Sequence, residues 1–235
     1  DVKLALKLLA EWNGEMNEHL PEPLIFYSWM RRLQERLVQD ELGVLAKEFG
    51  NFDPIFLERV FRNIDGASVW CDIVQSIAQE ECDAIAELAL YDAISELKAR
   101  YKVDITSLRW GDAHIAMHDH LTLGHIPFLN LLLNLRQSVS GGDYTLQRGL
   151  SSGNKYNPFE NVHAAVYRGV YDFSDPDSSL YIISTGQSGH LFSRHYDDLG
   201  QLWRRGEYIA MSLDPELAKA ASNGTTKIIP ASNLQ

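Results

Sequence analysis

The chain of 235 residues is 45% hydrophobic and 23% charged, which is typical of a globular protein with one large or two modest domains. Its 21 basic and 32 acidic residues give a net charge of −11, which disfavours a nucleic-acid partner because it repels phosphates. The 16 Gly and 8 Pro form no low-complexity tract, and the longest apolar runs, such as residues 128–135, are too short to span a membrane.

Residues 1–102 are predicted to form a helical region. Gly and Pro are sparse there, and apolar residues recur at helical spacing. Asn13-Gly14 is expected to end the first helix, and Pro23 suits the first turn of the second. Asp53 followed by Pro54 is typical of an N-cap and the first turn of a third helix. The expected helices cover residues 2–12, 23–38, 55–64 and 83–101.

Residues 103–235 are predicted to form a mixed α/β segment, because most of the Gly and Pro residues lie there. Residues 162–173 and 180–184 are expected to pair as a β-hairpin around the turn Ser174-Asp175-Pro176-Asp177. Further expected elements are a strand at 145–147, a helix at 195–205 and a last strand at 225–229 after an Asn223-Gly224 turn. The fold class is therefore α+β, with a sheet whose other strands are expected to lie outside this sequence.

Four of the eight histidines, His114, His118, His120 and His125, fall in one stretch. On a helix His114 and His118 share a face, where Asp119 could complete a zinc site. However, the HExxH pattern and a recognised spacing to a third ligand are absent. Packing histidines are therefore the favoured interpretation, and a metal-dependent hydrolase that uses this stretch is the alternative.

Two glycine-containing segments invite a catalytic or anion-binding interpretation. The sequence Gly-Gln-Ser-Gly-His at 186–190 resembles a G-x-S-x-G nucleophile elbow, but His190 replaces the last glycine. A tight turn explains this segment better than a Ser188 nucleophile does. The sequence Gly141-Gly142-Asp143 lacks the Lys and Ser/Thr of a P-loop, so it is also interpreted as a turn.

Cys71 and Cys82 are the only cysteines. On one continuous helix they would lie about 16 Å apart, which is too far for a disulfide, whereas a helix break near residues 79–81 would let them meet. The sequence alone leaves free thiols and one bridge open. Asn223-Gly224-Thr225 matches a glycosylation acceptor, but Asn-Gly here is better interpreted as a turn. The five tryptophans lie among apolar neighbours and are expected to pack in the core or an interface.

The second half of the chain contains an ordered series of motifs. They are Trp-Gly-Asp-Ala-His at 110–114, Gly-Gly-Asp-Tyr-Thr at 141–145, Arg-Gly-Val-Tyr-Asp at 168–172, Gly-Gln-Ser-Gly at 186–189 and Ser-Arg-His-Tyr-Asp-Asp at 193–198, followed by Trp203. This series resembles the C-terminal part of the β chain of the penicillin acylase family, and residues 8–14 resemble the helical region that precedes it. The enzymes of that family are N-terminal-nucleophile hydrolases with an αββα fold, and they include penicillin, cephalosporin and acyl-homoserine-lactone acylases.

The resemblance implies amide hydrolysis by an N-terminal Ser, Cys or Thr, whose own α-amino group acts as the base. Residue 1 here is Asp, and the family's oxyanion Asn and supporting Arg match no residue of this chain. We therefore expect a processed or cropped chain with no catalytic, cofactor-binding or metal-binding residue of its own. Leu199 also lies where many relatives carry Gln, which leaves the subgroup open.

The expected partner is the remainder of the acylase, which comprises the α chain and the N-terminal part of the β chain. The resemblance also implies a periplasmic or extracellular location, and a disulfide between Cys71 and Cys82 like that of some relatives. The substrate expected for the whole enzyme is a small acyl amide, with neither nucleic acid nor a membrane as partner. A non-catalytic binding or structural module remains a second alternative.

Overall fold

The computed structural model describes residues 1–49, 51–222 and 224–230. It divides into two compact units, the first comprising Asp1–His118 and Arg136–Ala164 and the second Asp119–Leu135 and Ala165–Gln235. The predicted division at residue 102 remains a prediction. Among the described residues, no helix combines the length and hydrophobicity that a membrane crossing needs.

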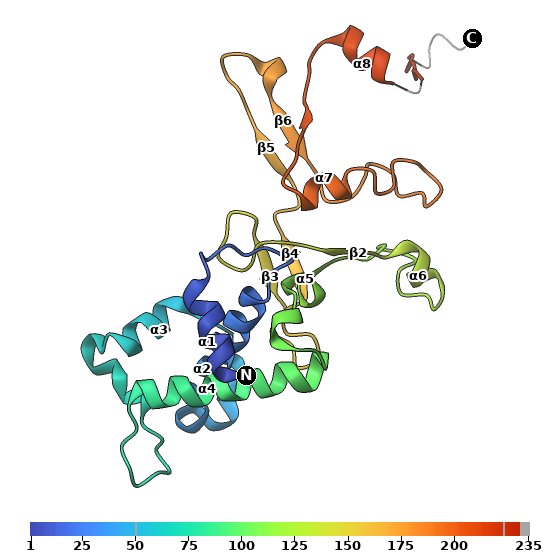
Figure 1. Cartoon of the computed structure of the whole chain (residues 1–235). Coiled ribbons are helices and arrows are strands. Elements are labelled where there is room, and N and C mark those ends of the chain that lie inside the picture. The colour runs from blue at the N-terminus through green and yellow to red at the C-terminus, as the bar shows by residue number, and fades with distance from the viewer. Residues whose placement is uncertain (50, 223, 231–235) are drawn as a thin grey trace. The chain divides into compact units, whose positions relative to one another are not determined.

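The first unit contains the helices of the N-terminal region and a four-stranded sheet (Figure 1). Its α-helices are α1 (Val2–Glu11), α2 (Glu22–Leu42), α3 (Pro54–Phe61), α4 (Cys82–Tyr101) and α5 (Trp110–Ala113). Short 3₁₀ helices cover Gly43–Phe49, Ile64–Cys71 and Ile105–Ser107. The predicted helices are thus confirmed with small shifts, since α2 extends to Leu42 and α3 ends at Phe61.

Local sequence signals account for where these helices begin. Pro23 lies in the first turn of α2. The Asp53 carboxylate accepts hydrogen bonds from the backbone N–H groups of Ile55 and Phe56, at 2.9 and 3.2 Å. Asp53 is therefore the N-cap predicted for α3.

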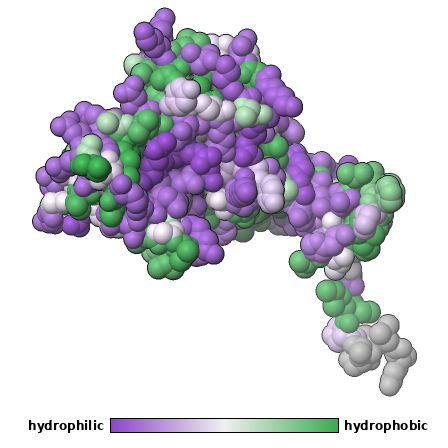
Figure 2. Space-filling model, turned by 90° about the horizontal axis from the view of Figure 1, so that it is seen from below, coloured by the Kyte–Doolittle hydropathy of each residue, from purple (hydrophilic) through white to green (hydrophobic). Residues whose placement is uncertain are grey.

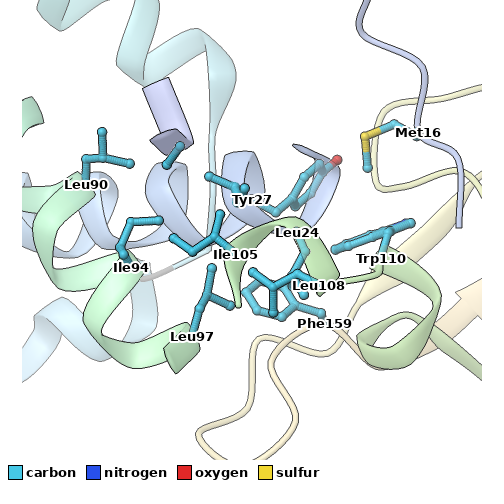
Figure 3. Packing of buried hydrophobic residues seen from close by; sticks show 12 residues of the cluster. Met16, Leu24, Tyr27, Leu90, Ile94, Leu97, Ile105, Leu108, Trp110 and Phe159 are labelled. Carbon is cyan, nitrogen blue, oxygen red and sulfur yellow. The ribbon is translucent and has the colours of Figure 1, made fainter. Parts of the chain in front are cut away.

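Helices α2 and α4 pack side by side and enclose the core of the first unit. Leu24 of α2 shares one buried cluster with Leu97 of α4 (Figure 3). Ile25 of α2 belongs to the same cluster. A second cluster joins the following turns of α2 to the first turns of α4. The Trp29 indole N–H also donates to the carbonyl of Ala86 at 2.8 Å. The buried side chains of these two helices thus make up much of the hydrophobic core of the first unit.

A disulfide between Cys71 and Cys82 closes the segment that precedes α4. The 3₁₀ helix ends at Cys71 and α4 begins at Cys82, so the two residues lie on separate elements and their Cα atoms are 5.0 Å apart. The helix is therefore interrupted between the two cysteines, and of the two alternatives that the sequence allowed, free thiols or one bridge, the structure contains the bridge. The bridge anchors this loop to the second cluster, where Cys71 is buried.

The sheet of the first unit has the strand order β2-β1-β4-β3. Strand β1 pairs in parallel with β4, and β3 pairs with β4 in antiparallel orientation. The predicted strand at 145–147 is wrong, because those residues form bends and the strand begins at Gly149. The strands are β1 (Ile115–His118), β2 (Leu135–Ser138), β3 (Gly149–Ser151) and β4 (Asn161–Ala164).

The second unit contains a three-stranded antiparallel sheet in the order β5-β6-β7. The predicted hairpin is confirmed, although its first arm, residues 162–173, is divided between β4 and β5. The predicted strand at 225–229 is wrong, since β7 completes the sheet instead. Asn223 of the preceding turn lies outside the described residues. The elements are α6 (Leu129–Leu133), β5 (Arg168–Val170), a 3₁₀ turn (Pro176–Ser178), β6 (Leu180–Ile182), α7 (Gly200–Arg204), β7 (Ile209–Ala210) and α8 (Pro215–Ala221).

Candidate functional site

The motifs at 110–114 and 141–145 meet in the core of the first unit. The fully buried Trp110 donates its indole N–H to the carbonyl of Gly141 at 2.7 Å, and its ring lies 5.2 Å from that of Tyr27 (Figure 3). Gly141 has a φ of 92°, and a Cβ there would lie 1.9 Å from the carbonyl oxygen of Gln147. A side chain is therefore excluded at Gly141, and both motifs serve the packing of this unit.

His114 is enclosed in this core as a neutral base. Its ring stacks on Trp110 with centroids 4.5 Å apart, and its Nδ1 lies 2.7 Å from the carbonyl oxygen of Phe159. Because a carbonyl only accepts, Nδ1 carries the proton. Burial lowers the pKa of His114 from 6.5 to about 4. A Cβ on Gly149 would lie 2.3 Å from Nε2, so His114 is a packed core residue rather than an accessible catalytic base.

The buried His114 should make the stability of the fold depend on pH. The unfolded chain takes up this proton near pH 6.5 and the folded chain only near pH 4, so the folded state loses stability as the pH falls through this window. We expect a loss of about 3 kcal/mol in the free energy of unfolding between pH 7 and pH 4. Urea denaturation at both pH values, compared with His114→Gln, measures this contribution. An equally large loss in the variant would assign the effect to other groups.

The structure does not support the helical face on which the zinc alternative depended. Residues 115–118 form strand β1, so His114 and His118 do not share a helix. His120 belongs to the second unit, where its Nδ1 accepts from the backbone N–H of Leu123 at 3.2 Å. No group of three or more His, Cys, Asp or Glu residues able to hold a metal ion occurs within the described part of the chain.

A cavity of about 230 Å³ opens in the first unit between α2 and the loops that flank β3. The Asp143 carboxylate faces it and accepts hydrogen bonds from the backbone N–H and the hydroxyl of Ser151, both at 2.9 Å. The backbone N–H of Asp143 donates to the Tyr27 hydroxyl at 3.1 Å. Burial, together with the Asp143 charge, raises the pKa of Tyr27, which stays protonated. The walls include Tyr27, Arg31, Phe52, Asp143, Tyr144 and Phe159.

This cavity is a candidate binding site in the first unit, and sequence reasoning singled out only two of its residues. Asp143 and Tyr144 belong to the Gly-Gly-Asp-Tyr-Thr motif, and the sequence indicated that its Gly-Gly-Asp part is a turn. Tyr27 and Arg31 come from α2, where their spacing is that of an ordinary helix. Only the folded chain brings them to the same cavity.

The motifs at 186–189 and 193–198 pack against each other in the second unit. The backbone N–H of Ser188 donates to the carbonyl of His195 at 2.9 Å, and a Cβ on Gly186 would lie 2.1 Å from that oxygen. The His195 Nδ1 lies 2.7 Å from an Asp198 carboxylate oxygen. These contacts hold residues 186–198 in loops. The predicted helix at 195–205 is therefore shorter than expected, since α7 begins at Gly200.

No strand–turn–helix geometry surrounds Ser188. Helix α7 begins only at Gly200, whereas a nucleophile elbow leads directly from strand to helix. The Ser188 Oγ accepts a hydrogen bond from the backbone N–H of His190 at 3.1 Å. These observations agree with the structural interpretation of this motif.

The motif at 168–172 begins on β5, and its arginine joins that strand to α7. The Arg168 guanidinium lies 5.6 Å from the centre of the Trp203 ring and donates to the Trp203 carbonyl. The Trp203 indole N–H donates to the carbonyl of Ala165 at 3.0 Å. Arg168 and Trp203 therefore have structural roles in the second unit.

The fold of the chain is α+β, and it is similar to that of a solved structure, a thermostable penicillin G acylase from Alcaligenes faecalis. The TM-score is 0.53 at 14% identity, and the match covers 98% of this chain and 43% of the acylase chain. The sequence model of the penicillin amidase family matches residues 1–220, and the chain belongs to that family.

Two curated relatives support the same family. Penicillin acylase 2 proenzyme of Pseudomonas sp. (strain SE83) is 24% identical over 230 residues, and the match covers 95% of this chain and 28% of that protein. Acyl-homoserine lactone acylase QuiP of Pseudomonas syringae pv. tomato is 24% identical over 226 residues, and the match covers 90% of this chain and 26% of that protein. The chain thus spans about a quarter of the length of these relatives. The resemblance seen in the sequence motifs is confirmed.

Proposed function

We propose that this chain is the C-terminal part of an acylase that hydrolyses linear amides, such as the acyl bonds of β-lactam antibiotics or acyl-homoserine lactones. The observation that carries the proposal is the penicillin amidase family match over residues 1–220. The names of the relatives, a penicillin acylase and an acyl-homoserine lactone acylase, support the same two substrate classes.

Within that acylase, the chain is proposed to supply scaffold rather than the nucleophile. Both cysteines are paired in a disulfide, and the His114 imidazole is enclosed in the core. The Ser188 hydroxyl is part of a loop without the geometry of a nucleophile elbow. The motifs that resemble the family hold strands and loops together, which supports a structural contribution.

The proposed partner is the remainder of the acylase, and the apolar surface of the second unit supports it. Large hydrophobic side chains there are almost fully exposed, as expected for a surface that another part of a protein covers. Figure 2 shows hydrophobic residues at several places among hydrophilic ones on the viewed face. The exposed hydrophobic side chains of the second unit include Leu121 at 88%, Phe128 at 82%, Leu131 at 79%, Phe173 at 96% and Phe192 at 88%.

A periplasmic or extracellular location is part of the proposal. The bridge between Cys71 and Cys82 supports it, because disulfides persist in oxidising compartments and are rare in the reducing cytosol.

An activity assay tests the proposal directly. The chain of residues 1–235 and the longer product of its gene are purified and incubated with chromogenic phenylacetyl and long-acyl amides. We expect the longer protein to release the chromophore and the isolated chain to release none, because the chain brings no nucleophile. In cell fractions, the activity should be recovered with the periplasm or the medium.

Each outcome has a distinct meaning. Turnover by the isolated chain that survives removal of contaminating full-length enzyme would defeat the scaffold assignment. A longer product with no activity on any acyl amide would favour the non-catalytic binding module instead. Activity confined to the cytosol would contradict the proposed location.

A further inference from the structure

A second cavity of the first unit is rich in positive charge, although the chain as a whole carries −11. It measures about 600 Å³ and lies between α2, α4 and the loop before β4. Five cationic side chains line it, against the carboxylates of Glu35 and Glu96. The local excess of cations favours a negatively charged ligand. The cations are those of Arg31, Arg32, Lys47, Arg100 and Lys155.

The Glu96 carboxylate lies within 3.9 Å of three of these cations. Glu96 lies 2.7 Å from the Arg32 guanidinium and 3.0 Å from that of Arg100. The Arg31 guanidinium is 3.9 Å from the same carboxylate, which is beyond hydrogen-bond distance. Arg32 and Arg100 therefore make the close contacts to Glu96, and Arg31 has only a distant Coulombic contact with it.

Arg31 is a mostly buried cation whose hydrogen-bond donors are available. Its side chain is 20% exposed, and burial lowers its pKa. Within the described part of the chain, its guanidinium donates no hydrogen bond to a protein acceptor. Arg31 has no nitrogen among the fully buried side-chain atoms that lack a partner, so water can reach its donors. A planar anion that accepts from both arms of the guanidinium can replace that water with charge-assisted hydrogen bonds. Arg31 is thus prepared for a carboxylate.

Arg31 also lines the smaller, aromatic cavity of about 230 Å³ described above. Arg31 is therefore a lining residue of both the basic cavity of about 600 Å³ and the aromatic cavity. The aromatic cavity exceeds the roughly 150 Å³ that accommodates a benzene molecule in a protein core. Asp143 also lines it and accepts hydrogen bonds from Ser151 at both oxygens. Its negative charge disfavours an anion at that wall, which therefore suits the uncharged ring of a ligand. The aromatic walls are Phe52, Tyr144 and Phe159.

We propose that Arg31 and the aromatic cavity beside it form a binding site for a small aromatic carboxylate. The carboxylate lies on the Arg31 guanidinium, and the ring lies against the pair of Phe52 and Tyr144, whose own rings pack edge to face with centroids 5.7 Å apart. The site uses no nucleophile, so it is independent of the acylase function proposed above.

Calorimetric titration of the purified protein with benzoate at low ionic strength tests the site, with benzyl alcohol and inorganic phosphate as comparison probes. We expect one benzoate per chain, and much weaker binding of both other probes, because each lacks either the charge or the ring. Arg31→Gln should weaken benzoate binding by about ten- to a hundredfold, the range of a charge-assisted hydrogen bond. Tyr144→Ser should weaken benzoate binding and leave phosphate binding unchanged.

The matched control is Arg62→Gln. Arg62 is 71% exposed, pairs with Glu58 and lines neither cavity, so benzoate binding should be unchanged. Arg31→Lys keeps the charge and should show an intermediate loss, which retains a test if Arg31→Gln does not fold. Absence of benzoate binding, an unchanged affinity in both Arg31 variants, or phosphate binding as tight as benzoate would each overturn the proposal. Acyl-amide turnover measured on the same samples reports separately on the acylase function.

Discussion

Replacing Trp110 by alanine should lower the free energy of unfolding by about 3 to 5 kcal/mol. Trp110 is fully buried and its ring contacts those of Tyr27, His114 and Phe159. Alanine leaves a cavity that these rings cannot fill without moving, and it removes the donor to the carbonyl of Gly141. Urea denaturation followed by circular dichroism measures the difference.

Two further variants separate the causes of this loss. Trp110→Phe keeps most of the ring volume but leaves the Gly141 carbonyl without its donor, so it should lower the free energy of unfolding by about 1 to 3 kcal/mol. Trp12→Ala is the control, because Trp12 is only partly buried and packs at the edge of the same cluster. If Trp110→Ala were no more damaging than Trp12→Ala, the central position of Trp110 in this core would be wrong.

The helices of the first unit were predictable because their signals are local. The Asp53-Pro54 pair contains both the N-cap and the first turn of α3, and the structure shows the cap hydrogen bonds at those residues. The apolar spacing of residues 83–101 likewise predicted α4, which spans Cys82–Tyr101. In each case a few neighbouring residues contain the information.

The strands were less predictable because they are short and depend on distant partners. The three-residue strand β3 exists through its pairing with β4, and its register follows from residues that lie at least ten positions away. Residues 145–147, which the sequence predicted to be extended, form bends in which the Thr145 hydroxyl donates to the Gln147 carbonyl at 2.9 Å. Residues 225–229, Thr-Thr-Lys-Ile-Ile, are mostly β-branched and so favour a strand, yet β6 pairs with β7 instead.

The candidate binding site was hidden for the same reason. Arg31 lies on α2, and its availability depends on how Arg32 and Arg100 share the Glu96 carboxylate across two helices. The spacing of residues within one segment of the sequence cannot predict this competition between side chains of two helices. The histidine stretch shows the converse, because its local pattern suggested a helical face that strand β1 removes.

Replacing both Cys71 and Cys82 by alanine should lower the free energy of unfolding by about 2 to 4 kcal/mol. The bridge joins residues eleven positions apart, so its loss frees the loop before α4 in the unfolded chain. Cys71 also packs in a buried cluster with Leu37, Val60 and Ile85. Alanine is chosen because serine would bury a hydroxyl there and add a separate cost. Urea denaturation without reductant measures the loss.

Reduction of the unmodified protein provides the matched comparison. A thiol reductant should shift its denaturation midpoint toward that of the double alanine variant and leave the variant's own midpoint unchanged, because the variant has no bridge to break. Side-chain truncation at the buried Cys71 persists in the variant alone, so any remaining difference between the two reports the packing of that residue. If the reductant left the midpoint of the unmodified protein unchanged, the bridge would not contribute to stability. The conclusion that a covalent link stabilises the loop before α4 would then be wrong.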